Sequence, residues 1–271
     1  MEFYKFKDNK ISFDPNRYLF QYNTYDNLEY YLKNLTVGAS SLYDFNDIFE
    51  RMFKIRLFQK SDSVEQHLRS VLLQASNGKS DHKRLVTTIE DYLKEFKISC
   101  FSKNPLEPLM WSHYADKHHG ICLVFDRNQF LDSSIKGGNV NYSNLIPNQA
   151  FFQGRTTQAE MGEIVYNIIH TKSLHWRYEQ EFRYSKLQKE RYFSFNPKSL
   201  KGIILGFNNT NEKAITEKIS HFEQENDSRV KIFYSYPNKS NFEMEISTEP
   251  YKNNSHSSNQ GMYFDLPPFE F

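Results

Sequence analysis

The chain has 271 residues, a formal net charge of +1, ten glycines and 16% aromatic residues. This length suffices for one large domain or two small ones, and the near-neutral charge argues against a protein that binds nucleic acid mainly by neutralising phosphates. Neither G-x-G-x-x-G nor G-x-x-x-x-G-K-[ST] occurs, so the sequence lacks the commonest glycine-rich nucleotide-binding loops.

The sequence has no apolar run of the roughly 20 residues that cross a membrane, and its first residues alternate aromatic with charged side chains instead of forming an apolar leader. We therefore expect a cytoplasmic protein without a membrane partner. The two cysteines, Cys100 and Cys122, lie in predicted strands, where we expect buried, reduced thiols.

The first third of the chain predicts two extended segments followed by helices. Residues 17–22 and 35–40 read as short strands around a helix at 24–33. Between residues 46 and 94 the apolar residues recur at helical spacing in two groups, separated by a break at residues 76–78: Val64, Leu68, Val71 and Leu72, then Leu85, Ile89, Tyr92 and Leu93. The pattern predicts a helical insertion at residues 46–94.

The rest of the chain alternates predicted strands with helices. A helical turn at 110–115 and helices at 159–171 and 211–225 are separated by strands, which we expect at 96–101, 120–125, 139–142, 181–186, 192–195, 202–206, 230–234 and 242–246. We predict a single α+β domain over residues 1–250, with mostly antiparallel or mixed central β-sheets and the helical insertion at 46–94. Residues 251–271 read as a polar C-terminal tail.

Three short stretches combine residue types that carry chemistry. In F-N-D-I-F-E (residues 45–50), Asn46 or Asp47 can cap the following helix, and the sequence leaves open whether Asp47 and Glu50 are structural or functional. In W-S-H-Y-A (residues 111–115), His113 can contact a ligand beside Trp111, bond a nearby carbonyl, or bind a metal.

The third stretch is W-R-Y-E-Q-E-F-R at residues 176–183. If residues 178–184 form a strand, Glu179, Glu181 and Arg183 share one face, opposite an aromatic face. Neighbouring carboxylates raise the pKa of one of the pair while Arg183 keeps the other ionised, an asymmetry suited to acid–base chemistry. The alternative is an exposed strand edge with compensating charges.

Together these stretches resemble the bacterial domain-of-unknown-function family 2971. The resemblance covers about residues 22–206, and its elements are F-N-D with Glu50, C-F-S at 100–102, M-W-S-H-Y-A at 110–115, H-G-I-C at 119–122 with Phe125 and Asp126, and Lys172, Trp176, Tyr178, Glu179, Glu181 and Arg183. It implies an accessory protein of mobile elements or antiviral defence loci, with a partner protein from such a locus.

Glu179-Gln180-Glu181 also resembles the Glu-x-Glu form of ADP-ribosyltransferases. That superfamily has an early strand with His or Arg and a second with Ser-Thr-Ser or Tyr. Arg17 or Tyr22 could stand for the first and Ser40-Ser41 for the second, although His-x-Thr is absent and Ser40-Ser41 lies just past its strand.

The second resemblance implies an enzyme, an antiviral-defence or toxin effector, that consumes NAD and transfers its ADP-ribosyl group to a protein or nucleic-acid acceptor. Glu181 would stabilise the oxocarbenium-like transition state and Glu179 would orient or deprotonate the acceptor; we expect Glu181→Gln to abolish nicotinamide release with the melting temperature nearly unchanged. His113 would help to hold the substrate. The expected nucleotide-binding residues are Tyr22, Trp111, Tyr114, Lys172, Trp176 and Arg183.

Two other functions stay open. One is a metal-dependent nuclease or phosphodiesterase in which Asp47, Glu50, Glu179 and Glu181 bind a divalent ion beside Lys172. The other is a non-catalytic sensing or adaptor module with an aromatic pocket. The preferred interpretation needs NAD as a substrate and no metal.

Overall fold

The computed structural model describes residues 3–7, 10–58, 78–130, 134–152 and 158–250. Its strands are β1 (Lys5–Lys7), β2 (Lys10–Ser12), β3 (Tyr18–Asn23), β4 (Thr36–Gly38), β5 (Lys54–Phe58), β6 (Phe96–Ser102), β7 (Ile121–Asp126), β8 (Lys136–Asn139), β9 (Asn141–Ser143), β10 (Asn148–Phe152), β11 (Thr171–Ser173), β12 (Glu181–Leu187), β13 (Tyr192–Ser194), β14 (Leu200–Leu205), β15 (Lys231–Pro237) and β16 (Met244–Ser247).

The α-helices are α1 (Asp26–Asn34), α3 (Gly78–Glu95), α4 (Pro108–Tyr114), α5 (Gln158–Ile169) and α6 (Glu212–Asn226). Short 3-10 helices are η1 (Leu42–Asp44), η2 (Ile48–Arg51), η3 (Arg127–Gln129), η4 (Leu174–Glu179) and η5 (Pro197–Ser199). None of the helices in the described part of the chain is both long and apolar enough to cross a membrane.

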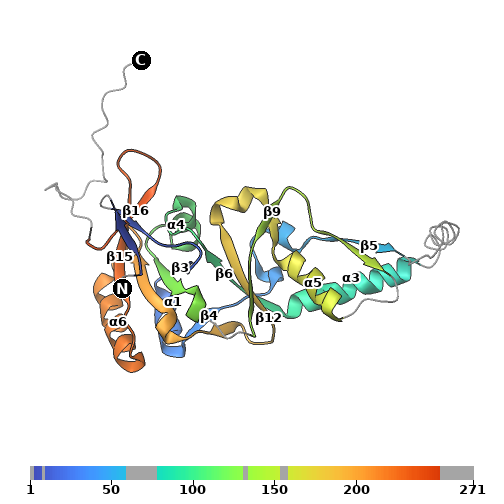
Figure 1. Cartoon of the computed structure of the whole chain (residues 1–271), viewed down its shortest axis with the longest axis horizontal. Helices are drawn as coiled ribbons and strands as arrows, with labels where there is room; N and C mark the ends of the chain where they lie inside the picture. The colour runs from blue at the N-terminus through green and yellow to red at the C-terminus, as the bar shows by residue number, and fades with distance from the viewer. Residues whose placement is uncertain (1–2, 8–9, 59–77, 131–133, 153–157, 251–271) are drawn as a thin grey trace, which may run out of the picture.

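A central sheet has the strand order β16-β15-β14-β7-β3-β6-β12-β8. Its strands pair antiparallel except for β14 and β15, which are parallel and connected through α6. In Figure 1, α1 and α6 lie near the β14–β16 end of the elongated molecule, whereas α3 and α5 lie beyond β12 at the other end. The predicted α+β class with a mostly antiparallel central sheet is confirmed.

Both faces of the central sheet are covered, which explains the continuous apolar run of β7. Ile121, Leu123 and Phe125 point into a core shared with α1 and α6, while Cys122 and Val124 point into a second core with α4. Successive side chains of a strand alternate between faces, so a strand buried on both faces must be apolar throughout.

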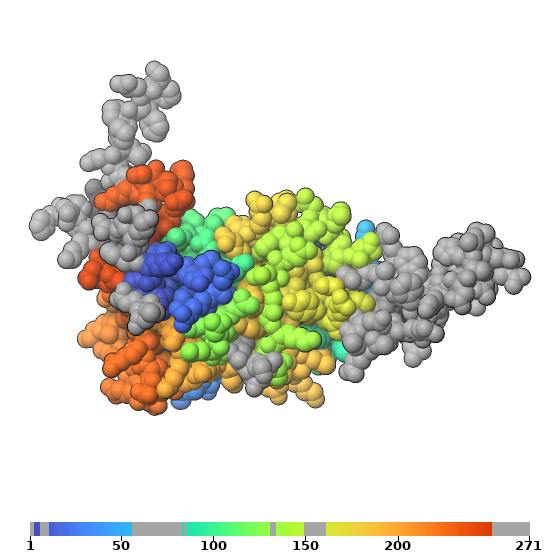
Figure 2. Space-filling view, viewed as in Figure 1, coloured from blue at the N-terminus to red at the C-terminus, as the bar shows by residue number. Residues whose placement is uncertain are grey.

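The N-terminal segment closes the second core at one end of the sheet. The rings of Phe3, Tyr4 and Phe13 pack around Phe233 of β15. In Figure 2 this blue segment lies on the surface beside the orange-red C-terminal strands. Aromatic pairs of this edge-to-face kind account for part of the high ring content of the sequence.

A third core lies at the opposite end of the molecule. It is built by Ile89 and Leu93 of α3, by Ile98 of β6, and by the apolar stripe of α5. The predicted stripe of α5 is confirmed, since Ile164, Val165, Ile168 and Ile169 are all buried in it.

The region predicted as a helical insertion is only partly helical. Helix α3 matches its second predicted helix, whereas the first predicted helix, around residues 64–72, lies outside the described residues. Residues 48–51 form a single 3-10 turn and Lys54–Phe58 is strand β5, which pairs in parallel with β10. A partner strand about ninety residues away along the chain decides this conformation, and no local spacing reveals it.

Candidate functional site

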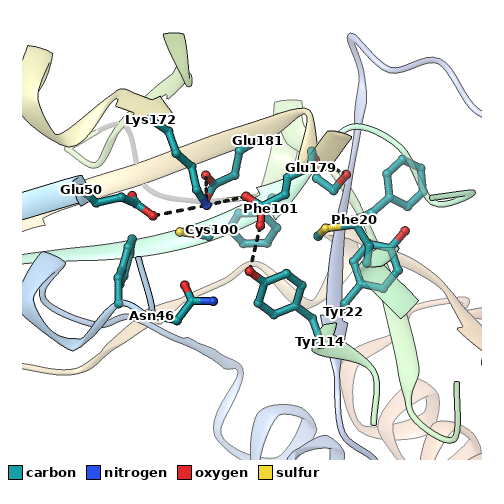
Figure 3. Close-up of a pocket in the computed structure, with 13 residues that line it drawn as sticks. Phe20, Tyr22, Asn46, Glu50, Cys100, Phe101, Tyr114, Lys172, Glu179 and Glu181 are labelled. Carbon is teal, nitrogen blue, oxygen red and sulfur yellow. Dashed lines mark hydrogen bonds and ion pairs between the residues drawn. The ribbon is translucent and has the colours of Figure 1, made fainter. Parts of the chain in front are cut away.

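A cavity of about 350 Å³ lies at the ends of β3, β6 and β12, bounded by α4, η2 and η4 (Figure 3). Ligand pockets of proteins commonly start near this volume. Most of its wall is apolar or aromatic, and the polar groups gather on one side. The lining residues are Phe20, Tyr22, Phe45, Asn46, Glu50, Cys100, Phe101, Ser102, Met110, Tyr114, Lys172, Glu179 and Glu181.

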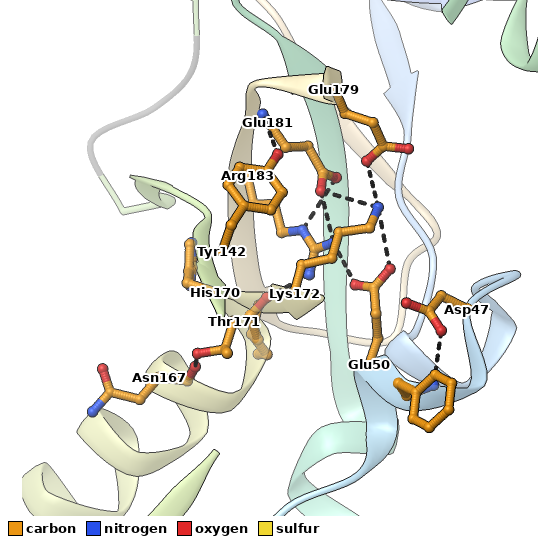
Figure 4. A network of polar contacts seen from close by, with 12 residues as sticks. Asp47, Glu50, Tyr142, Asn167, His170, Thr171, Lys172, Glu179, Glu181 and Arg183 are labelled. Carbon is orange, nitrogen blue, oxygen red and sulfur yellow. Dashed lines mark hydrogen bonds and ion pairs between the residues drawn. The ribbon is translucent and has the colours of Figure 1, made fainter. Parts of the chain in front are cut away.

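The polar side of the cavity is a buried cluster of ions centred on Lys172 (Figure 4). The Lys172 ammonium lies 2.5 Å from Glu179 Oε2, 3.3 Å from Glu50 Oε1 and 3.4 Å from Glu181 Oε2. Its Nζ also lies 4.9 Å from the ring centroid of Trp176. Three carboxylates from η2, η4 and β12 therefore converge on one ammonium.

Arg183 of β12 supports this cluster from behind the cavity wall. Its guanidinium donates to both Glu181 oxygens, at 3.2 and 2.8 Å, to Glu50 Oε2 and, at 2.5 Å, to the Ile169 carbonyl at the end of α5. The side chain is fully buried. The planar fork of arginine has five N–H donors, so this one side chain can hold two carboxylates and a carbonyl at once.

The environments of the two neighbouring glutamates shift their pKa values in opposite directions. Burial alone would raise the pKa of Glu181, but the charges of Arg183 and Lys172 outweigh burial and lower this pKa to about 2. For Glu179 burial dominates and raises the pKa above its ordinary value, despite the Lys172 ammonium beside it. Glu181 thus stays ionised, while Glu179 is the better proton acceptor.

Tyr114 connects the aromatic wall to the ion cluster. Its hydroxyl donates to Glu179 Oε1 at 2.8 Å, and Asn46 lines the cavity beside it. Burial and the Glu179 charge raise the pKa of Tyr114, so the phenol remains protonated and remains a donor. Glu179 is therefore held from both sides, by Tyr114 on one oxygen and Lys172 on the other.

The local backbone explains how Glu179 and Glu181 both reach Lys172. The predicted strand at residues 181–186 is found as β12, but the condition that residues 178–184 form one strand is not met, because Glu179 ends the 3-10 helix η4 and the strand begins at Glu181. Between them Gln180 adopts a left-handed conformation with φ of 46°. This turn changes the direction of the chain. The turn, and not the alternation of side chains along a strand, brings the two carboxylates together.

The same two glutamates and Arg183 were also open to interpretation as an exposed charged edge. The structure contradicts that alternative, because Glu179, Glu181 and Arg183 are at most 5% exposed. Strand β12 lies between β6 and β8 and is not at the edge of the sheet.

Five of the predicted site residues line the cavity: Tyr22, Tyr114, Lys172, Glu179 and Glu181. Arg183 lies directly behind them. The Tyr22 ring faces the cavity while its hydroxyl donates to the Asn104 carbonyl at 2.8 Å. Residues from four separate segments of the sequence are thus brought to one place.

Three predicted site residues do not line the cavity. Trp111 is fully buried in the core and donates through Nε1 to the Pro105 carbonyl at 2.9 Å. His113 is exposed on α4 next to Tyr114 and does not reach the ion cluster. Trp176 is half-buried under Lys172. On the short helix α4, Met110 and Tyr114 face the cavity, and this orientation turns His113 away from it.

Of the residues proposed by analogy with transferase strands, Tyr22 lines the cavity, but Arg17, Ser40 and Ser41 lie elsewhere. Arg17 binds Asp126 at the end of β3 opposite Tyr22. Ser40 bridges to Ile98 and Ser41 caps η1, and neither lines the cavity.

The structure separates the two acidic residues whose role the sequence left open. Asp47 caps η2, accepting from the Phe49 amide at 2.9 Å, as the capping interpretation predicts. Glu50, one turn further, belongs to the ion cluster. Their three-residue spacing on a 3-10 helix gave no sign of this division.

Several lining residues had no assigned role in the sequence. Phe101 was expected in the core, and it serves both the core and the cavity wall. Cys100 is half-buried on that wall, while Cys122 is buried as expected. The motif F-N-D-I-F-E pointed to this region, but only the folded chain places Phe45 and Asn46 beside Tyr114.

The cluster argues against the divalent-ion arrangement of the nuclease alternative. The point where Glu50, Glu179 and Glu181 converge holds the Lys172 ammonium, and Asp47 is engaged as a helix cap. Within the described ranges, no group of three or more His, Cys, Asp or Glu side chains has the arrangement of a metal site.

Comparison with curated proteins gave no match, and comparison with solved structures gave none either. Among protein families, the chain matches one described as a protein of unknown function, DUF2971, over residues 110–184. The matched segment begins in α4 and ends in β12, and so contains Tyr114, Lys172, Glu179, Glu181 and Arg183. This match supports the DUF2971 family for the segment that carries Lys172, Glu179, Glu181 and Arg183 of the ion cluster.

Proposed function

We propose that the cavity binds a small-molecule nucleotide and cleaves its N-glycosidic bond, with NAD as the substrate class. The observation that supports it is the pair of buried glutamates, Glu179 and Glu181, on the wall of an aromatic-lined cavity with opposite pKa shifts. Pairs of carboxylates with separated pKa values are the usual machinery for glycosidic cleavage.

In this mechanism the bond between the ribose C1′ and the nicotinamide nitrogen breaks, and its electron pair leaves with the nicotinamide. The ribosyl group becomes oxocarbenium-like, and the anionic side of the cavity stabilises it, with Glu181 permanently ionised. A hydroxyl, amine or water then attacks C1′ and gives its proton to Glu179. Tyr114 and Lys172 hold Glu179 in place for this transfer.

The aromatic wall supports the choice of a flat leaving group. Phe20, Tyr22 and Phe45 contribute rings to the cavity wall, and the Phe45 ring lies beside the ion cluster, 5.2 Å from the Arg183 guanidinium carbon. Flat rings bind best between such side chains, through area burial and offset or edge-on contacts. The proposal includes transfer of the ADP-ribosyl group to a protein or nucleic-acid acceptor. It also includes a partner protein from a defence locus.

The decisive variant is Glu179→Gln in the full chain. We expect the rate of nicotinamide release from NAD, measured by chromatography, to fall roughly 10²–10⁴-fold. This is the range that a positioned general base contributes to a rate. Glu190→Gln, which changes an exposed glutamate after β12, should keep the wild-type rate. An unchanged rate in Glu179→Gln would contradict this mechanism.

The structure changes what Glu181→Gln can show. Glu181 is paired with Arg183 and Lys172 inside the protein, so its neutralisation leaves buried cations undercompensated. We now expect a lowered melting temperature for this variant, in place of an unchanged one. If wild-type protein binds NAD but releases no nicotinamide with any acceptor, the sensing module is the better assignment.

A further inference from the structure

The charged groups that face the cavity are predominantly acceptors. Among the described lining residues four are charged, namely Glu50, Lys172, Glu179 and Glu181. The single ammonium has three N–H bonds and lies within 3.4 Å of all three carboxylates. The Lys172 charge is therefore already committed and offers little to an anionic ligand.

Arg183 does not change this balance toward the cavity. It is fully buried behind the wall and is occupied by Glu50, Glu181 and the Ile169 carbonyl. Counted by formal charge, these three carboxylates and two cations carry one net negative charge. A phosphate or carboxylate placed in the cavity would meet this charge without a free donor cation.

Glu50 is ion-paired with Lys172 and Arg183, yet it supplies a second sign of an unfilled position, because one of its oxygens lacks a hydrogen bond. Its side chain is 3% exposed and lines the cavity. Oε1 lies 3.3 Å from Lys172 Nζ but accepts no hydrogen bond from the described residues. A buried carboxylate oxygen without a hydrogen bond costs free energy, and a donor from a ligand would recover it.

The remaining wall suits a flat cation. Phe20, Tyr22, Phe45 and Tyr114 present rings to a cavity whose polar side is anionic (Figure 3). Ring faces attract cations, most strongly where water is excluded.

We propose that this cavity binds a flat organic cation, of the amidinium or pyridinium class, with N–H groups or ring charge directed at Glu50 and Glu179. Anionic groups of the same ligand, such as phosphates, then lie outside the cavity. The inference rests on the proposed function in that it takes the same cavity as the substrate site, but it concerns binding and needs no turnover.

Three probes of nearly equal shape test the proposal: benzamidine, benzamide and benzoate, which carry positive, zero and negative charge. Titration calorimetry on the full chain at neutral pH should give benzamidine about a tenfold lower Kd than benzamide, as a desolvated cation–π and charge contribution implies. Benzoate and inorganic phosphate should not bind. Equal affinities for benzamidine and benzamide, tight binding of benzoate, or no binding of benzamidine at millimolar concentration would each overturn the proposal.

Glu50→Gln should reduce the preference for benzamidine over benzamide, whereas Glu190→Gln should leave it intact. Because Glu50 also binds Arg183, the variant could unfold, and the binding of the three probes to the wild-type protein then tests the proposal alone.

The outcome is separable from the proposed function. Charge discrimination without NAD cleavage leaves this inference standing, and cleavage with three equal affinities leaves only the enzymatic proposal.

Discussion

Arg183 shows how one side chain holds together segments that are distant in the sequence. From strand β12 it reaches Glu50 in η2, Glu181 on its own strand and the carbonyl end of α5. Burying a guanidinium costs several kcal/mol, and the cost is offset only when its partners are all present. The residue therefore positions Glu181 and Glu50 and is sensitive to any change in either.

Replacing Arg183 by methionine should destabilise the fold by roughly 3–5 kcal/mol, because Glu50 and Glu181 would remain buried with one cation fewer. The matched control is Arg191→Met, which removes an exposed pair with Asp44 and should cost no more than about 1 kcal/mol. Urea denaturation of both variants measures the difference. Equal losses of unfolding free energy in the two variants would show that the buried cluster stabilises the fold no more than an exposed ion pair does.

At the residue scale, the structure brings together several of the residues that the sequence singled out around one cavity. Glu179 and Glu181 were singled out because two carboxylates beside Arg183 suit acid–base chemistry, with an exposed charged edge as the alternative. Glu50 was left open, since one acidic residue at a helix start has a sufficient explanation in capping. Only its contact with Lys172 and Arg183 assigns it to the cluster.

At the scale of elements, the connection from α4 to β7 is the most constrained segment near the site. Asp116, Lys117 and His118 are all left-handed, with φ between 46° and 70°. Non-glycine residues adopt this conformation at a cost. The His118 and Gly120 carbonyls accept hydrogen bonds from the loop after β14, and these contacts hold the turn.

Gly120 closes this turn, and its lack of a side chain is required. A Cβ there would lie 2.2 Å from the Asn23 carbonyl oxygen and 2.9 Å from the backbone of Ala115. Because both neighbours are backbone atoms, Gly120→Ala should destabilise the fold by about 1–3 kcal/mol, as overpacking does.

The control is a glycine in an open position. Gly162 lies in α5, and a Cβ there would meet nothing within 4 Å. Gly162→Ala should therefore stabilise the fold by about 0.5–1 kcal/mol through helix propensity alone. Thermal unfolding monitored by circular dichroism distinguishes the two, and a destabilised Gly162→Ala or a neutral Gly120→Ala would count against this account.

Element identity followed the sequence wherever the pattern was local. The stripe of α5 and the apolar run of β7 were predicted and found. Strand β5 was missed because its partner β10 is remote, and the turn at Gln180 was missed because a single left-handed glutamine has no sequence signature.

At the scale of the whole molecule, the central sheet joins the three cores. Strand β6 contributes Ile98 to the third core and Phe101 to the first. Strand β12 likewise places Phe182 in the first core while Arg183 bonds α5. Elements shared in this way argue for one cooperative unit, and the single domain over residues 1–250 stays a prediction.

Two matched core variants test whether the chain unfolds as one cooperative unit. Ile203 belongs to the first core and Ile168 to the third, and both are fully buried. Replacing either by alanine should cost about 2–5 kcal/mol and shift one common unfolding transition. Two separate transitions in calorimetry, with Ile168→Ala moving only one of them, would instead divide the chain into two domains.

The sequence by itself determined the fold class, the periodic helices α3 and α5, the doubly buried strand β7 and several of the residues that line the cavity. These features depend on the local spacing and the chemistry of residues, both of which can be read directly from the sequence. The tertiary structure alone decided which of the chemically active residues meet. It removed Trp111 and His113 from the cavity, placed Glu50 against Lys172 and Arg183, and separated the pKa values of Glu179 and Glu181. Burial and charge pairing arise between distant segments, so no spacing along the sequence can show them.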